Sequence, residues 1–138
     1  EHLVVDLMLK MGYGSNNPES AQVTKHSGDE GIDGIIYEDK LGLDKIYLQA
    51  KQWTSVVVGR PELQNFVGAL AGQSANKGVF ITTSFFSKEA REYVKGLTQK
   101  VVLIDGKELA NYMIEVNVGV TPKKVYEVKR IDIDYFEE

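Results

Sequence analysis

Apolar and polar positions in the first half of the chain predict a helix followed by three strands. Apolar residues recur at helical spacing ahead of glycines 12 and 14, where the helix should end: Leu3, Val4, Leu7, Met8 and Met11. A short strand is expected at 22–26. Apolar runs at 35–37 and 46–53, separated by a polar, glycine-containing stretch, predict two strands joined as a hairpin.

The second half of the chain predicts helices that alternate with strands. Pro61 suits the first turn of a helix whose apolar stripe consists of Leu63, Phe66, Val67 and Leu70. Strands are expected at 77–83 and 101–104. Ser87 is the predicted N-cap of a helix that ends at about Gly96. Asp105 is the predicted N-cap of a last helix that ends at about Val116. Strand–helix–strand order favours a parallel pair with a right-handed crossover. The predicted fold is therefore α/β, with a mixed central sheet of about five strands flanked by helices.

Composition adds limits to this fold. The chain has 138 residues, of which 43% are hydrophobic and 26% charged, and this suits one compact domain. The absence of cysteine excludes disulfides, thiolate zinc sites and cysteine nucleophiles. No apolar run is long enough to span a bilayer and no signal segment is visible, so we expect a cytoplasmic protein with no membrane partner. The net charge of −4 argues against broad nonspecific binding to nucleic acid.

The last part of the chain differs in pattern from the rest. Residues 1–119 form the predicted domain, and 120–138 mix charged residues with Val, Tyr and Ile after a break at Pro122. This pattern predicts an extended C-terminal arm across a partner, or an edge strand, that belongs to the same domain.

Three polar residues are expected to converge at one end of the hairpin. Residues two apart on a strand point to the same face, so Gln49 and Lys51 should project together. Asp33 stands at the entry of the preceding strand, and antiparallel pairing brings that entry near the exit of the next strand. Alone, an aspartate beside glycines is a common turn residue, and a lysine on a strand is usually a solvated charge. The joint pattern is what favours a site.

The chemistry that fits these three residues is hydrolysis of a phosphodiester. Mg²⁺ prefers oxygen ligands and keeps several waters, so the carboxylate of Asp33 and the amide oxygen of Gln49 are sufficient protein ligands. Lys51 would orient or help deprotonate the attacking water and offset charge at the scissile phosphate. Neither role needs histidine or cysteine.

At these residues the chain resembles the PD-(D/E)XK nuclease superfamily, and more closely the catalytic domain of Mrr-like type IV restriction endonucleases. The segment 28–34 looks like the family's glycine-rich aspartate motif, and Gln49-Ala50-Lys51 looks like its Gln-x-Lys motif. The likeness continues in order and spacing from residue 1 to about 113. It includes the helix with residues 64–70, the strand 78–83 with Ser84, and the pair Ile104-Asp105.

The resemblance implies roles for five residues. Asp33 would be the metal-binding acid, Gln49 the second ligand position, Lys51 the catalytic lysine, Glu1 the acid on the first helix, and Gln64 a supporting residue. It implies a restriction-endonuclease-like fold and Mg²⁺ or Mn²⁺ as cofactor. It also implies double-stranded DNA, including methylated DNA, as substrate. A homodimer is compatible with it, and a natural N-terminal DNA-reading domain is expected outside this chain.

Two alternatives share the same pattern. A Holliday-junction resolvase or repair nuclease has the same fold and ligand arrangement, and branched DNA would distinguish it from a restriction enzyme. A catalytically inactive DNA-binding domain is the alternative from another class, because Gln49 stands where related enzymes carry an acid. In that case the loss of Lys51 would leave DNA binding unchanged.

Overall fold

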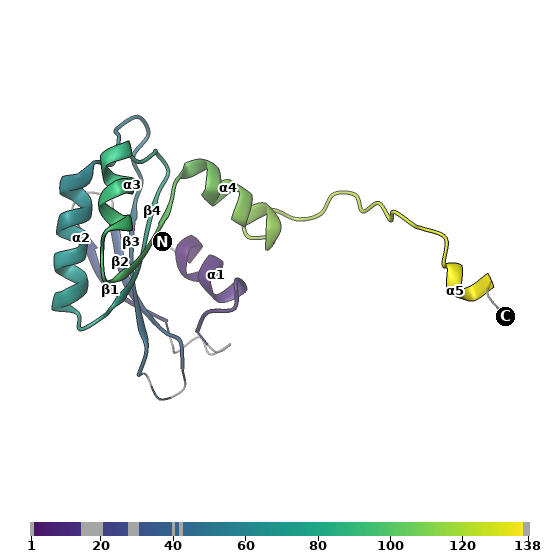
Figure 1. Cartoon of the computed structure of the whole chain (residues 1–138), viewed down its shortest axis with the longest axis horizontal. Coiled ribbons are helices and arrows are strands. Elements are labelled where there is room, and N and C mark those ends of the chain that lie inside the picture. Colours follow the sequence, from purple (N-terminus) through teal and green to yellow (C-terminus); the bar gives the residue numbers. More distant parts are fainter. Residues whose placement is uncertain (1, 15–20, 28–30, 40, 42, 137–138) are drawn as a thin grey trace.

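The computed structural model describes residues 2–14, 21–27, 31–39, 41 and 43–136. Ten helices and strands follow one another in these residues, and Figure 1 shows their arrangement: α1 (His2–Lys10), β1 (Ala21–Ser27), β2 (Gly31–Tyr37), β3 (Lys45–Lys51), α2 (Arg60–Gly72), β4 (Lys77–Thr82), α3 (Lys88–Lys95), β5 (Lys100–Ile104), α4 (Gly106–Glu115) and α5 (Ile133–Phe136). The five strands and four helices predicted from the sequence are all present, and α5 is additional.

The strands form one mixed sheet in the order β1-β2-β3-β4-β5. The β1–β2 and β2–β3 pairs are antiparallel, and the β3–β4 and β4–β5 pairs are parallel. This confirms the predicted hairpin, the parallel half and the mixed five-stranded sheet. None of the helices in the described ranges has the length and apolar content needed to cross a bilayer.

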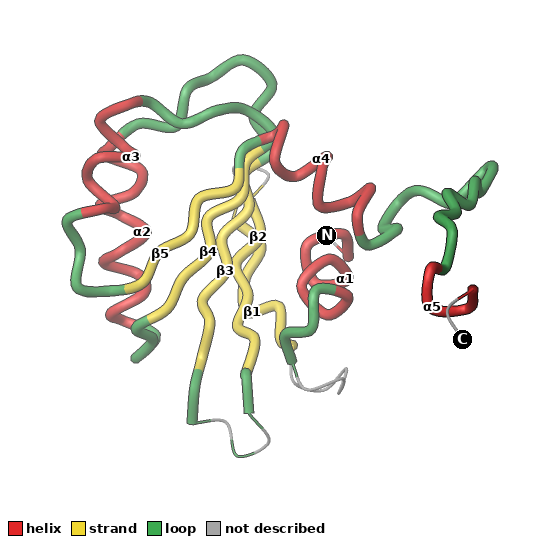
Figure 2. The backbone as a smooth tube through the Cα atoms, turned by 45° about the vertical axis from the view of Figure 1, so that its right-hand side comes forward, coloured by secondary structure: helices red, strands yellow, loops and turns green. Residues whose placement is uncertain are grey.

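Helices cover both faces of the sheet. The helices α2 and α3 lie on one face, and α1 and α4 lie on the other (Figure 2). Because side chains alternate along a strand, β3 contributes to two separate cores. Ile46 and Leu48 belong to the core under α1 and α4, whereas Tyr47 belongs to the core under α2 and α3. The Phe66 ring of α2 lies 5.5 Å from the Tyr47 ring, measured between centroids.

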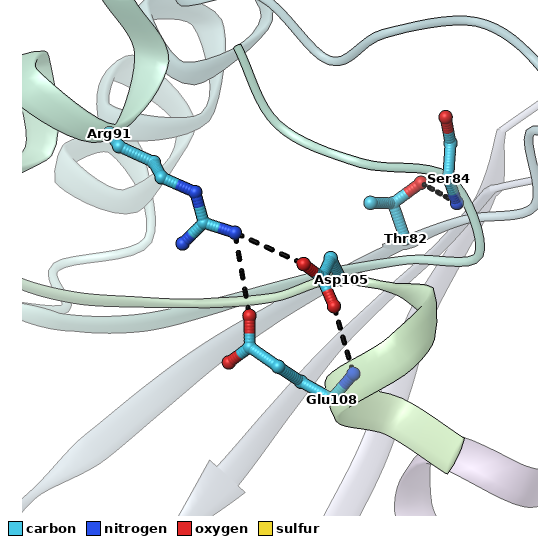
Figure 3. A network of polar contacts seen from close by, with 5 residues as sticks. All are labelled: Thr82, Ser84, Arg91, Asp105 and Glu108. Carbon is cyan, nitrogen blue, oxygen red and sulfur yellow. Dashed lines mark hydrogen bonds and ion pairs between the residues drawn. The ribbon is translucent and has the colours of Figure 1, made fainter. Parts of the chain in front are cut away.

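Predicted caps begin two of the helices. The Ser87 side chain accepts a hydrogen bond from the Ala90 N–H at the start of α3. Asp105 accepts one from the Glu108 N–H, 2.8 Å away, at the start of α4. Figure 3 shows that Arg91 of α3 also reaches the carboxylates of Asp105 (3.1 Å) and Glu108 (3.4 Å). Asp105 therefore both caps α4 and ties it to α3.

Replacing Asp105 by alanine should lower the free energy of unfolding by about 1–2 kcal/mol, because an N-cap is lost. Asp105→Asn keeps a side-chain acceptor for the Glu108 N–H and removes only the half-exposed ion pair with Arg91, so its loss should stay below about 1 kcal/mol. Urea unfolding of both variants measures the difference. Equal losses in the two variants would show that the ion pair, rather than the cap, stabilises this end of α4.

The C-terminal segment lies away from the sheet (Figure 1). Residues 120–136 are exposed, contain no strand, and have the four-residue α5 as their regular element. The edge strand expected here is therefore not found in the described part of the tail. The alternative of an arm across a partner stays a prediction.

Candidate active site

The α2-facing side of β3 changes from apolar to polar toward the end of the strand. Tyr47 is buried, whereas Gln49 and Lys51 are half-buried. The polar end of β3 opens into a pocket of about 240 Å³, which is lined by Gln49, Lys51, Trp53, Glu62, Asn65 and Phe80. The strand therefore places Gln49 and Lys51 together in one pocket, as their spacing predicts.

The hairpin register adds the predicted acid to this end of the sheet. Asp33 of β2 pairs with Gln49 of β3, and Gly31 pairs with Lys51. On the other side of β3, the parallel strand β4 pairs Phe80 with Gln49 and Thr82 with Lys51. Gln49 and Lys51 therefore lie on β3, between β2, which carries Asp33, and β4.

Hydrogen bonds fix the backbone beside Lys51. The Thr83 N–H donates to the carbonyl oxygen of Lys51 at 3.3 Å, and the Thr83 hydroxyl donates to that of Trp53 at 2.7 Å. The Ser84 hydroxyl donates to the carbonyl oxygen of Val56, and its N–H donates to the Thr82 hydroxyl. These bonds join the segments that follow β3 and β4, so the rim of the pocket is held from two strands.

An aromatic ring limits the positions of the Lys51 ammonium. Its Nζ lies 5.9 Å from the centroid of the Trp53 ring, within the range of a cation–π contact. Trp53 follows Lys51 at strand spacing and lines the same pocket. The ammonium is therefore held between its own strand and an indole face.

Glu62 brings a carboxylate to the pocket from α2. Gly59 is the N-cap of this helix, and its N–H donates to Glu62 Oε2 at 3.1 Å, which is the half of a capping box that a glycine N-cap can form. This bond holds the Glu62 side chain back toward the start of the helix. Asn65, one helical turn further on, lines the pocket beside it.

The donor set fits a hard divalent cation. The pocket offers the amide oxygen of Gln49 and the carboxylate of Glu62, and the register places Asp33 opposite Gln49. In the described residues, no group of three acidic, histidine or cysteine side chains is gathered as a closed metal site. Mg²⁺ needs no such cage, because it retains several waters and binds through one or two carboxylates.

Two other predicted site residues have different outcomes. Glu1 lies outside the described residues. Gln64 is exposed and does not line the pocket. The helical rotation of about 100° per residue explains this difference: positions three apart share a face of α2, so Glu62 and Asn65 face the pocket while Gln64 does not.

Sequence reasoning missed Glu62 and Asn65 as pocket residues. A signal was present, because Glu62 stands three residues after Gly59, the spacing at which a glutamate accepts from the N-cap N–H, and Asn65 stands three residues after Glu62. These two polar residues flank the apolar stripe of α2 on its sheet-facing side. That stripe is confirmed at Leu63, Phe66 and Leu70, which are buried.

Comparisons with known proteins identify the family of this chain. The family model "Mrr_cat: Restriction endonuclease" matches residues 1–113. The chain is 49% identical, over 137 residues, to the type IV methyl-directed restriction enzyme EcoKMrr of Escherichia coli strain K12. That match covers 99% of this chain and 44% of the relative, so the chain spans less than half of the relative's length.

Two solved structures share the fold. The DNA modification-dependent restriction endonuclease AspBHI superposes with a TM-score of 0.59 at 20% identity, over 83% of this chain and 30% of the other. The MspJI restriction endonuclease, solved with a 27-mer oligonucleotide, gives a TM-score of 0.52 at 18% identity, over 86% and 27% of the two chains. The predicted restriction-endonuclease-like fold is confirmed. With the match over residues 1–113, the chain belongs to the Mrr_cat family of restriction endonucleases.

Proposed function

We propose that this chain is the catalytic domain of a modification-dependent endonuclease that hydrolyses phosphodiester bonds in double-stranded DNA with Mg²⁺ or Mn²⁺. The observation that carries the proposal is the position of Gln49 and Lys51 on one face of β3, in one pocket, with Asp33 opposite Gln49 in the hairpin register. Family membership supports the nuclease activity.

The chain's own groups divide the work between binding the cation and stabilising the charge of the transition state. Asp33 and Gln49 would supply oxygen ligands to the cation. A divalent cation held there would neutralise part of the negative charge that develops on the scissile phosphate. The Lys51 ammonium, positioned by Trp53, stabilises the same charge and orients the attacking water.

The substrate follows from the relatives. The E. coli relative is named as methyl-directed, and one structural neighbour was solved with an oligonucleotide. We therefore infer that the full-length protein acts on methylated DNA. The chain has a net charge of −4 and spans 44% of the relative, so we infer that a further N-terminal region reads the DNA. We also propose a cytoplasmic location and a homodimer, in which two copies of the site would cut the two strands of the duplex.

The test is cleavage of plasmid DNA by the natural full-length protein. Methylated and unmethylated plasmids are incubated with Mg²⁺, with Mn²⁺, or with EDTA. We expect cleavage of the methylated plasmid that is at least about tenfold faster than that of the unmethylated plasmid, because one well-read base contact contributes about 1–3 kcal/mol. EDTA should abolish it. Cleavage that persists in EDTA, or no cleavage of any DNA, contradicts the proposal.

One observation favours a second function. Gln49 is neutral where a carboxylate would bind metal more tightly, and this would suit a DNA-binding domain without catalytic activity. That function predicts metal-independent binding of DNA with no cleavage under any of these conditions. The same plasmid assay, followed by a binding assay, separates the two functions.

A further inference from the structure

The pocket that contains Gln49 and Lys51 has one acidic residue among the described residues that line it, and this residue is Glu62. We propose that Glu62 is the second carboxylate of the metal site and supplies the negative charge that Gln49 lacks. This inference rests on the proposed function, because it assigns a further ligand to the same metal-dependent site. It places that ligand on α2, outside the hairpin that carries the predicted Asp33–Gln49–Lys51 set.

The first support is the fixed position of the carboxylate. Gly59 N–H donates to Glu62 Oε2 at 3.1 Å, so the side chain is held at the start of α2 rather than extended into solvent. Glu62 is half-buried, and its pocket neighbours include both Gln49 and Lys51. A carboxylate has two oxygens with about four lone-pair positions, so one hydrogen bond at Oε2 leaves capacity for a cation.

The second support is the charge of the site. Gln49 contributes a neutral oxygen, and Lys51 contributes a positive charge that opposes cation binding. Asp33 alone would only balance that positive charge. With Glu62 the site has a net negative charge, and this is the electrostatic condition for holding a divalent cation next to an ammonium.

Capping of α2 is a separate role that Glu62 already performs, and it can be separated from metal binding. The cap needs only an oxygen that accepts from Gly59 N–H, and the amide oxygen of glutamine provides one. Glu62→Gln therefore keeps the hydrogen bond and removes the negative charge. Glu89→Gln is the matched control, because it removes the same charge from the first turn of α3, at an exposed position outside the pocket.

The experiment measures Mn²⁺ binding to the natural full-length protein by isothermal titration calorimetry, with and without a DNA duplex. We expect Glu62→Gln to weaken Mn²⁺ affinity by about 10- to 100-fold, comparable with Asp33→Asn, and Glu89→Gln to leave it unchanged. The urea midpoint of Glu62→Gln should fall by no more than that of Glu89→Gln, because both variants keep their helix cap and each loses one carboxylate from a first helical turn.

Two results would overturn the inference. The first is a folded Glu62→Gln protein that binds Mn²⁺ as the wild type does, while Asp33→Asn loses binding; the proposed function then stands and only the role of Glu62 fails. The second is a wild-type protein that binds no Mn²⁺ even with DNA present, and this removes the metal-dependent function together with the inference.

Discussion

Alanine in place of Lys51 is expected to slow DNA cleavage by about 10²–10³-fold, the loss typical when one group that stabilises transition-state charge is removed. Lys51 is half-buried and lines the pocket with Gln49 and Glu62, and its Nζ lies 5.9 Å from the Trp53 ring centroid. DNA affinity should fall much less, since many phosphate contacts share it. Single-turnover cleavage and a binding assay on the same duplex measure the two effects.

Lys45→Ala is the matched control for Lys51→Ala. Lys45 is also half-buried and is the first residue of the same strand, whereas Lys51 is the last. It pairs with Tyr37, at the end of the hairpin opposite the pocket. Its loss should change the cleavage rate less than about twofold. If Lys51→Ala cleaves as fast as Lys45→Ala, then Lys51 has no part in the chemistry and the assignment of the site is wrong.

Replacing Gly106 by alanine is expected to destabilise the fold by about 3 kcal/mol, the upper part of the range for overpacked positions. Gly106 begins α4, and its N–H donates to the carbonyl oxygen of Ser84 at 2.9 Å. A Cβ on Gly106 would lie 2.3 Å from the carbonyl oxygen of Thr83. Because this neighbour is backbone, relief requires that the segment after β4 moves.

Gly68→Ala also replaces a glycine by alanine, but the expected change in stability has the opposite sign. Gly68 lies inside α2, and a Cβ there meets nothing within 4 Å. Alanine should therefore stabilise the protein by about 0.5–1 kcal/mol, because glycine is unfavourable in a helix interior. Urea unfolding of both variants should give changes of opposite sign. A stable Gly106→Ala protein would show that the contact between α4 and Thr83 is looser than the structure indicates.

Gly106→Ala should also affect cleavage beyond its effect on stability. The Thr83 N–H donates to the carbonyl oxygen of Lys51, and the Thr83 hydroxyl donates to that of Trp53. A shift of Thr83 is therefore transmitted to the pocket rim. Cleavage measured well below the unfolding midpoint should be slower than in the wild type.

Much of the fold could be predicted from local signals in the chain. Caps and periodicity are properties of neighbouring residues, so Ser87, Asp105 and the α2 stripe marked helices at their true places. The alternation of side chains along a strand, which puts Gln49 and Lys51 on the same face of β3, is also a local property. The tail was harder, because alternating apolar residues indicate a strand only where a partner edge is available. No described strand pairs with residues 120–136.

The site was predicted only as far as the hairpin extends. Asp33 and Gln49 lie on the two strands of one hairpin, so antiparallel pairing was enough to predict that they lie near each other, and the structure supplies the register that pairs them. The contribution of α2 depends on how the helix is rotated over the sheet, and a tertiary contact decides that. Local sequence signals by themselves therefore do not identify Glu62 and Asn65 as pocket residues, and Gln64 is predicted from the family resemblance alone.

The two cores that share β3 limit how this strand can change during evolution. Ile46 and Leu48 serve one core, while Tyr47, Gln49 and Lys51 face the other side of the sheet. Insertion or deletion of one residue inside β3, between Lys45 and Gln49, would exchange these sets and turn the polar side chains into the opposite hydrophobic layer. Fold and activity would then be lost in a single step, so changes in length should be tolerated in the turn before Lys45 and rejected within the strand.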